Sequence, residues 1–264
     1  MHPIIFQIGS FKLPAYGLMV ACGYLAAILY VFRRAAGAGF KKEELSDLVF
    51  YSVLAGMAGA KFFYAVTYWE SFGPDLLSKA AYLLRTFQYG FVFYGGLIFG
   101  AAAFLLAARR RGVNAPRAAD LFAPALALAH AFGRLGCFLA GCCHGRPAGG
   151  FPFAVVFDNP ACEVAPELLG VPVYPTQLFE AAGNLAIFAL LNFALGKKLR
   201  PGSVVALYAA LYSAQRFLIE FLRGDDRGAL HFGLSPAQLI SAAAFAAAIA
   251  IFAKLTLKAK NEKI

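Results

Sequence analysis

The sequence has few charged residues for a chain of 264 amino acids. Lys, Arg, Asp and Glu make up 14% of the residues, whereas hydrophobic residues make up 61% and the mean hydropathy is +0.66. Soluble domains contain about 25% charged residues, so this chain has too little polar surface to cover a folded, water-soluble body of its size. The composition excludes a soluble enzyme and a disordered chain, and it indicates a protein that lies in a lipid bilayer.

Acidic residues and cysteines are also scarce. Fourteen acidic residues against 24 basic ones give a formal net charge of +10. The basic residues lie in short clusters between apolar runs, where they orient membrane spans, so we expect no binding of nucleic acid. An odd number of cysteines in mostly apolar sequence argues against a disulfide framework. The five are Cys22, Cys137, Cys142, Cys143 and Cys162.

Seven apolar runs approach the roughly 20 residues that are needed to cross a bilayer. They lie near residues 15–32, 48–67, 91–108, 121–143, 175–196, 203–222 and 235–253. A shorter run, 76–85, contains Lys79 and is predicted to be an amphipathic helix along the membrane surface. The predicted fold is an all-α membrane protein, a bundle of seven transmembrane helices that forms a single domain over residues 1–264.

Lys and Arg are distributed unevenly over the loops. One alternate set of loops contains fifteen of them and the other set contains six. Cytoplasmic loops carry the positive excess, so the N-terminus is predicted outside and the C-terminus in the cytoplasm. The longest stretch between spans, residues 144–174, then lies outside as a small cap, with a short pair of strands predicted in residues 151–157.

Five ionisable residues lie inside the predicted spans, where each costs about 2.5–3.5 kcal/mol on insertion scales. They are Lys61, Arg134, Glu180, Arg216 and Glu220. The helical rise of about 1.5 Å per residue places all five in the outer half of the bilayer. Three cations against two carboxylates leave one positive charge in excess. This cluster predicts a site for an anionic ligand, and the phosphate of an outer-leaflet phospholipid matches the guanidinium fork.

Simpler interpretations exist for several of these residues. Arg216 and Glu220 can neutralise each other at their i to i+4 spacing, and Lys61 can extend to the interface, whereas the sequence neighbours of Arg134 offer no partner. Glycines in the segment 93–100 allow close approach of a headgroup or of another helix. Tyr16 and Tyr94 lie where an aromatic belt is expected.

Cys137, Cys142, Cys143 and His144 form a short run that suggests a metal site. Zinc and iron sites normally need four ligands at suitable spacing, and the adjacent Cys142 and Cys143 are not expected to point the same way. We therefore expect no metal and no other cofactor.

Five sequence blocks, in order over nearly the whole chain, resemble the bacterial prolipoprotein diacylglyceryl transferase family. They are Tyr16-Gly-Leu-Met, Tyr94-Gly-Gly-Leu-Ile, Gly133-Arg-Leu-Gly followed by Phe138 and Gly145, Pro175-Thr-Gln-Leu-Phe-Glu180, and Arg216-Phe-Leu-Ile-Glu-Phe-Leu-Arg223. The resemblance implies a multi-pass protein of the bacterial cytoplasmic (inner) membrane, with its site toward the periplasmic leaflet and its cap in the periplasm. It also implies transfer of the diacylglyceryl group of phosphatidylglycerol to the lipobox cysteine thiol of preprolipoprotein signal peptides, with release of glycerol 1-phosphate.

The resemblance also implies roles for single residues. Arg134 matches the family's phosphatidylglycerol-binding arginine, and Arg216 and Glu220 match an essential pair in the sixth span. The candidate catalytic residues are Arg134, Arg216, Glu220 and Tyr94. The candidate substrate-binding residues are Arg134, Tyr16, Lys61, Gly95, Gly96, Gly145, Glu180 and Arg223.

The chain departs from the family pattern at several of these positions. Tyr94 stands where the family has a histidine, Lys61 where it has an arginine, Cys137 and Ala140 where it has asparagines, and Cys142 where it has a glutamate. The base that deprotonates the acceptor thiol therefore stays open between Tyr94 and Glu220, and we favour Glu220 as the residue that orients Arg216. Two alternatives remain, a transporter or flippase of anionic phospholipid and a paralogue with a different acceptor.

Overall fold

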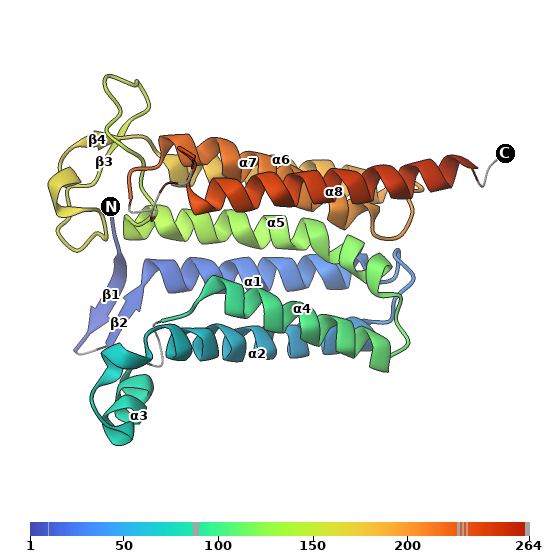
Figure 1. Ribbon diagram of the computed structural model, residues 1–264, viewed down its shortest axis with the longest axis horizontal. Coiled ribbons are helices and arrows are strands. Elements are labelled where there is room, and N and C mark those ends of the chain that lie inside the picture. The colour runs from blue at the N-terminus through green and yellow to red at the C-terminus, as the bar shows by residue number, and fades with distance from the viewer. Residues whose placement is uncertain (10, 87–89, 226–227, 229, 231, 262–264) are drawn as a thin grey trace. The chain divides into compact units, whose positions relative to one another are not determined.

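Seven long helices dominate the computed structural model, which describes residues 1–9, 11–86, 90–225, 228, 230 and 232–261 (Figure 1). All seven are long and apolar enough to cross a membrane, so the predicted all-α membrane fold is confirmed. They are α1 (Ala15–Arg34), α2 (Lys42–Thr67), α4 (Phe93–Arg110), α5 (Ala115–Ala140), α6 (Thr176–Leu195), α7 (Ser203–Ile219), which the 3-10 turn η3 (Glu220–Leu222) extends, and α8 (Pro236–Asn261).

The ends of these helices differ from the predicted spans in two ways. α2 begins at Lys42 and α5 at Ala115, because their first turns are polar and an apolar run does not reveal them. α5 ends at Ala140, before the predicted limit at residue 143. The reason is Gly141, whose backbone is left-handed with φ of +85° and turns the chain out of the helix.

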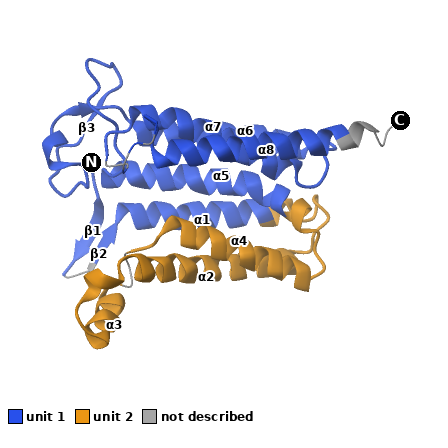
Figure 2. Cartoon of the chain, viewed as in Figure 1, with its two compact units in different colours: residues 1–31, 119–264 blue, residues 32–118 orange. Residues whose placement is uncertain are grey.

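The chain forms two compact units, one of residues Met1–Val31 and Ala119–Ile264 and one of residues Phe32–Ala118 (Figure 2). In unit 1, α7 contacts both α6 and α8. An apolar core joins α5, α6 and the beginning of α7 through small and branched residues, among them Ala127, Ile187, Leu191 and Val204. α1 lies against α5, where a Cβ on Gly23 would come within 2.9 Å of the Phe132 side chain.

Asp120 in α5 holds the beginning of α7. Its Oδ2 accepts the backbone N–H of Gly202 at 2.7 Å, and its Oδ1 accepts that of Val205 at 2.8 Å. The first N–H groups of a helix have no partner inside the helix, and the dipole favours a negative charge at that end. Asp120 therefore satisfies the N-terminus of α7 from a neighbouring helix.

Short strands complete unit 1. An N-terminal hairpin pairs β1 (Ile4–Ile8) with β2 (Phe11–Pro14), an element that the sequence did not predict. Between α5 and α6, β3 (Val155–Val156) pairs with β4 (Pro172–Val173), with the 3-10 turn η2 (Pro166–Leu168) between them. The strand pair predicted within residues 151–157 is wrong, because the single strand there pairs with a distant segment of the same loop. The periplasmic cap over residues 144–174 stays a prediction.

In unit 2, α2 and α4 pack closely along each other. The short helix α3 (Leu76–Arg85), which follows the 3-10 turn η1 (Trp69–Phe72), confirms the helix expected over residues 76–85. Glycines set the distance between the two long helices: a Cβ on Gly59 would lie 2.5 Å from Phe99 and 2.6 Å from the Gly95 carbonyl oxygen. A Cβ on Gly96 would instead make ordinary contacts at 3.4–3.5 Å with Gly56 and Ala60.

This contrast gives a test of the packing. Gly59→Ala should lower the free energy of unfolding by about 1–3 kcal/mol, because overpacking forces the two helices apart. Gly96→Ala is the control in the same helix pair and should change it by less than about 0.5 kcal/mol. Denaturant unfolding of the purified protein in detergent micelles measures both, and equal stability of the two variants would contradict the packing argument.

Candidate functional site

Arg134 and Glu180 form a buried ion pair in unit 1. Arg134 lies near the end of α5 and Glu180 near the beginning of α6, and the Arg134 Nε is 2.6 Å from the Glu180 Oε2. The side chains are 13% and 1% exposed, respectively. As expected, the sequence neighbours of Arg134 provide no partner, and the partner comes from another helix.

Glu180 also faces Arg223, so one carboxylate lies between two guanidinium groups. The Arg223 Nη1 is 3.6 Å from the Glu180 Oε1. The backbone carbonyl of Glu180 accepts hydrogen bonds from the side-chain amides of Asn184 at 2.8 Å and Gln215 at 3.0 Å. The Gln215 bond ties this turn of α6 to α7, so the carboxylate has a fixed position between the arginines.

Gly145 brings the backbone of Arg223 into place. The two residues form an antiparallel bridge. A Cβ on Gly145 would lie 2.4 Å from the Tyr174 carbonyl oxygen and 3.0 Å from that of Leu222, so no side chain fits there. The Arg223 side chain also pairs with Asp225, with the Nε 2.8 Å from the Oδ1. Close backbone packing thus explains why residue 145 is a glycine. Its contact with substrate stays a prediction.

Arg216 and Glu220 form a second ion pair at the end of α7. The side chains are 18% and 1% exposed. Glu220 Oε1 also accepts a hydrogen bond of 2.6 Å from the Ser235 hydroxyl. The Ser235 hydroxyl accepts the backbone N–H of Gln238, and the Gln238 side-chain oxygen accepts that of Ser235. The two residues form a capping box at the beginning of α8. The i to i+4 pairing that the simpler interpretation offered is present, and Glu220 additionally connects Arg216 to the beginning of α8.

We call these three guanidinium groups and two buried carboxylates the arginine cluster. Its members are Arg134, Arg216, Arg223, Glu180 and Glu220. The Tyr212 hydroxyl interacts electrostatically with members of both ion pairs. Asp225, the further acid beside Arg223, is 27% exposed. Within unit 1, Arg223 thus meets Glu180 and the partly exposed Asp225, and whether Lys61 joins the cluster stays a prediction.

Three cysteine thiols converge beside the arginine cluster. The sequence did not predict this convergence. The Sγ atoms of Cys137, Cys142 and Cys143 all lie within 4.8 Å of one another. The expectation that adjacent Cys142 and Cys143 cannot point the same way is wrong, because Cys143 has a left-handed backbone with φ of 59°. That conformation breaks the alternation of side-chain direction that an extended chain would impose.

The guanidinium groups affect the acidity of these thiols. Hydrogen bonds with Cys137 and Cys142 lower the pKa of Cys143 far below its ordinary value, and the charges of Arg223 and Arg134 lower it further. The thiol hydrogen bonds and burial raise the pKa of Cys142. Arg223 also forms a side-chain hydrogen bond with Cys143.

Tyr16 lies in the second position of α1, against the turn of α5 that follows Arg134. A Cβ on Gly136 would be 3.2 Å from the Tyr16 Cδ2. Tyr16 is 47% exposed. Its assignment to substrate binding stays a prediction, and so does that of every other candidate residue.

Lys61, Tyr94, Gly95 and Gly96 belong to unit 2. The Lys61 Nζ donates a hydrogen bond of 2.7 Å to the Thr86 carbonyl and faces the Tyr64 ring at 5.1 Å. Tyr94 is half-exposed at the beginning of α4. A Cβ on Gly95 would lie 2.3 Å from the Gly59 carbonyl oxygen, so helix packing alone explains this glycine.

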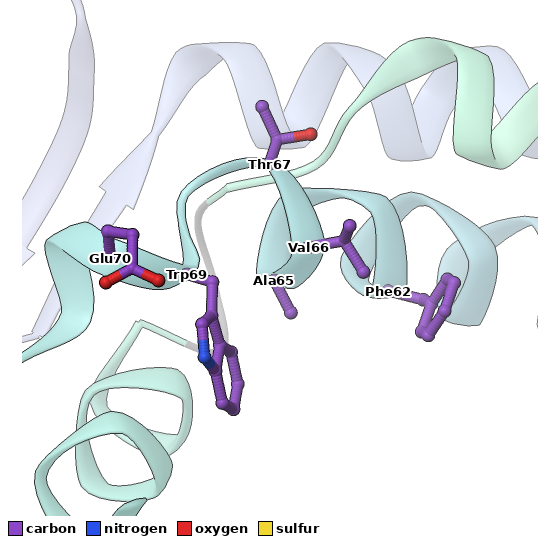
Figure 3. A pocket seen from close by; sticks show the side chains of 6 residues that line it. All are labelled: Phe62, Ala65, Val66, Thr67, Trp69 and Glu70. Atoms are coloured by element: carbon purple, nitrogen blue, oxygen red, sulfur yellow. The ribbon is translucent and has the colours of Figure 1, made fainter. Parts of the chain in front are cut away.

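A pocket of about 510 Å³ lies in unit 2 at the end of α2. Figure 3 shows its six lining residues, which are Phe62, Ala65, Val66, Thr67, Trp69 and Glu70. None of these six is a candidate site residue, and the one charged group among them is a carboxylate. An anionic ligand is therefore expected at the arginine cluster and not in this pocket.

Burial of the Glu180 carboxylate predicts a large cost for its removal. Glu180→Ala should lower the free energy of unfolding by about 3–5 kcal/mol, because it leaves buried guanidinium groups without their counter-charge. Asp47→Ala is the control, since Asp47 pairs with the half-exposed Arg111, and a pair of this kind is worth about 0–1 kcal/mol. Denaturant unfolding in detergent micelles measures both changes, and similar losses would mean that Glu180 is not a buried counter-ion.

The comparisons with known proteins agree with the resemblance in the sequence. The sequence model of the family described as prolipoprotein diacylglyceryl transferase matches residues 3–254. The chain is 34% identical over 262 residues to phosphatidylglycerol–prolipoprotein diacylglyceryl transferase 2 of Clostridium perfringens, with 99% of this chain and 98% of that protein covered. It is 32% identical over 243 residues to the phosphatidylglycerol–prolipoprotein diacylglyceryl transferase of Clostridium tetani, with 91% and 92% covered. The enzyme of the same name from Dehalococcoides mccartyi strain 195 is 33% identical over 254 residues, with 96% and 93% covered.

Proposed function

The chain belongs to the prolipoprotein diacylglyceryl transferase family, and we propose that it transfers the diacylglyceryl group of phosphatidylglycerol to the lipobox cysteine of prolipoproteins. The names of its relatives supply the donor lipid and the acceptor protein. The observation that carries the proposal is the arginine cluster, in which three guanidinium groups lie beside two buried carboxylates and the partly exposed Asp225. Such a cluster suits a phospholipid with an anionic headgroup.

Arg134 and Arg216 bind the phosphate in this proposal. Each guanidinium group has five N–H donors in a fixed fork, and one carboxylate engages only part of them. The remaining donors are available to the non-bridging oxygens of a phosphodiester. Because the carboxylates hold the forks in place before the lipid arrives, little reorganisation is needed when charge develops on the phosphate.

The reaction is a displacement at carbon. The acceptor sulfur, as a thiolate, attacks C3 of the diacylated glycerol, and the bond between that carbon and the phosphate oxygen breaks. The sulfur becomes a thioether, and the electron pair of the broken bond leaves with glycerol 1-phosphate, which gains one negative charge. The arginines stabilise this charge, while the thiol proton goes to a base or to solvent.

Glu220 orients Arg216 in this scheme. Its carboxylate pairs with Arg216 and accepts the Ser235 hydroxyl, so both of its oxygens are engaged. Because both oxygens are held by these partners, the orienting role is favoured over deprotonation of the thiol. Tyr94 stays the other candidate for the base.

The site opens toward the periplasmic leaflet of the bacterial inner membrane in this proposal. The positive-inside rule supports this orientation, because the loops on the opposite side from the cluster carry the larger share of Lys and Arg. A polar path through the inner half of the bundle, which a flippase would need, has little support. Asn192, one of the polar residues there, accepts a hydrogen bond of 2.9 Å from the Tyr30 hydroxyl.

Removal of either phosphate-binding arginine should slow transfer strongly. Arg134→Ala and Arg216→Ala should each reduce the rate about 100-fold or more, the scale for loss of one preorganised donor. Arg134→Lys and Arg216→Lys keep the positive charge but lose the planar set of N–H donors. These variants should therefore retain only part of the wild-type rate of transfer. The measurement is thioether formation by purified protein, with phosphatidylglycerol in detergent micelles and a lipobox peptide.

Arg111→Ala is the matched control, because Arg111 forms only a half-exposed ion pair with Asp47. It should leave the rate unchanged. Thermal unfolding shows whether each variant is folded. Near-normal transfer by a folded Arg134→Ala or Arg216→Ala variant would refute the assignment of phosphate binding.

A further inference from the structure

The three converging thiols have a geometry close to that of a metal site. Cys137 lies in the last turn of α5, and Cys142 and Cys143 lie in the loop that follows. Three sulfurs around a tetrahedral zinc ion, at the usual bond length of about 2.3 Å, stand about 3.8 Å apart. The Sγ atoms already lie within 4.8 Å of one another, so shifts of about 1 Å would close the site.

The loop is held in a costly conformation by the beginning of α6. The left-handed backbone of Cys143, a residue with a side chain, is unfavourable and persists only where the surroundings hold it. The Cys143 carbonyl accepts the Thr176 hydroxyl at 2.9 Å, and the Cys142 carbonyl accepts the Gln177 side-chain amide at 2.8 Å. These two bonds fix the loop, and the strained residue is the one that turns the third thiol toward the other two.

The surrounding charges suit a metal thiolate. Three thiolates around a divalent cation carry one net negative charge, which would be unfavourable at this depth without compensation. Arg223 forms a side-chain hydrogen bond with Cys143, and Arg134 interacts electrostatically with Cys137 and Cys143. The guanidinium groups thus offset the charge of an occupied site.

We infer that Cys137, Cys142 and Cys143 bind one zinc ion, or a similarly thiophilic divalent cation, as three thiolates, and that the fourth coordination position takes the thiol of the acceptor cysteine. The second part of this inference rests on the proposed function. Three protein ligands with one open position are the pattern of zinc sites that act on a substrate, whereas structural sites have four.

Such a site supplies what the reaction needs. A thiol that coordinates the cation loses its proton, which passes to solvent, and the sulfur keeps an electron pair for attack on the glycerol carbon. When the carbon–sulfur bond forms, the neutral thioether is a poor ligand and leaves the cation. Glycerol 1-phosphate departs with the electron pair of the broken bond, and no oxidant or reductant takes part.

The binding test uses the full-length protein, purified in detergent with its thiols reduced and its metal removed by a chelator. Titration with Cd²⁺ should give sulfur-to-cadmium charge-transfer absorption that saturates at one ion per chain, and Zn²⁺ should displace it. Cys137→Ser, Cys142→Ser and Cys143→Ser should each weaken binding by at least about 100-fold, because loss of even an outer-shell partner costs 10–100-fold. Cys162→Ser is the matched control and should bind normally, since Cys162 is a part-buried cysteine of the same loop outside the three-sulfur group.

The open position is tested without the lipid donor. X-ray absorption spectroscopy of the Cd²⁺-loaded protein should show three sulfur ligands when no peptide is present and four when a lipobox peptide is added. A control peptide with serine in place of the lipobox cysteine should leave the number at three. Absence of Cd²⁺ binding by the reduced protein overturns the inference, and so does equal weakening by Cys162→Ser. A count that stays at three with the cysteine peptide also overturns it.

Transfer assays separate this inference from the proposed function. Metal-free protein should lose transfer by at least about 10-fold and regain it on addition of Zn²⁺, and the zinc-loaded protein should be active. Full transfer by the metal-free protein overturns the zinc inference and leaves the transferase assignment intact. Inactivity of the zinc-loaded, folded protein toward phosphatidylglycerol and the lipobox peptide counts against the proposed function, while the Cd²⁺ titration still decides the site.

Discussion

The buried carboxylate of Glu180 determines which segments of unit 1 must pack together around the site. A charge that is 1% exposed must be compensated by nearby charges, because taking an ion out of water costs several kcal/mol. Glu180 meets this requirement with Arg134 from α5 and Arg223 from the segment after η3. Three segments that are far apart in the sequence must therefore come together before the carboxylate is stable. The donors that the carboxylate leaves unused are the ones available to a phosphate.

Much of this arrangement could be predicted from the sequence, because membrane insertion leaves a strong pattern. The seven spans follow from apolar length, and the buried ionisable residues stand out because they are rare there. The partner of Arg134 could not be predicted, since contacts between helices depend on how the helices rotate about their axes. Arg223 had a weaker signal: it follows Glu220 by three residues, which places both on one face of a continuing helix.

The thiol group shows a different limit of sequence reasoning. Adjacent side chains diverge in regular structure, and that rule fails at Cys143 because its backbone is left-handed. No residue type in the segment indicates this conformation, since glycine is the usual occupant and Cys143 is not glycine. The hydrogen bonds from Thr176 and Gln177 explain why the loop adopts it. The N-terminal hairpin was missed for a similar reason, because its strands are too short to show alternation.

The contact between Asp120 and the N-terminus of α7 has a consequence for Arg216. An α-helix rises about 1.5 Å per residue, so Val205 and Arg216 lie about 16 Å apart along the same stiff segment. A carboxylate near one membrane surface therefore determines how far toward the other surface the guanidinium group reaches. Asp120 therefore sets both the height and the rotation of the Arg216 group from the opposite end of α7.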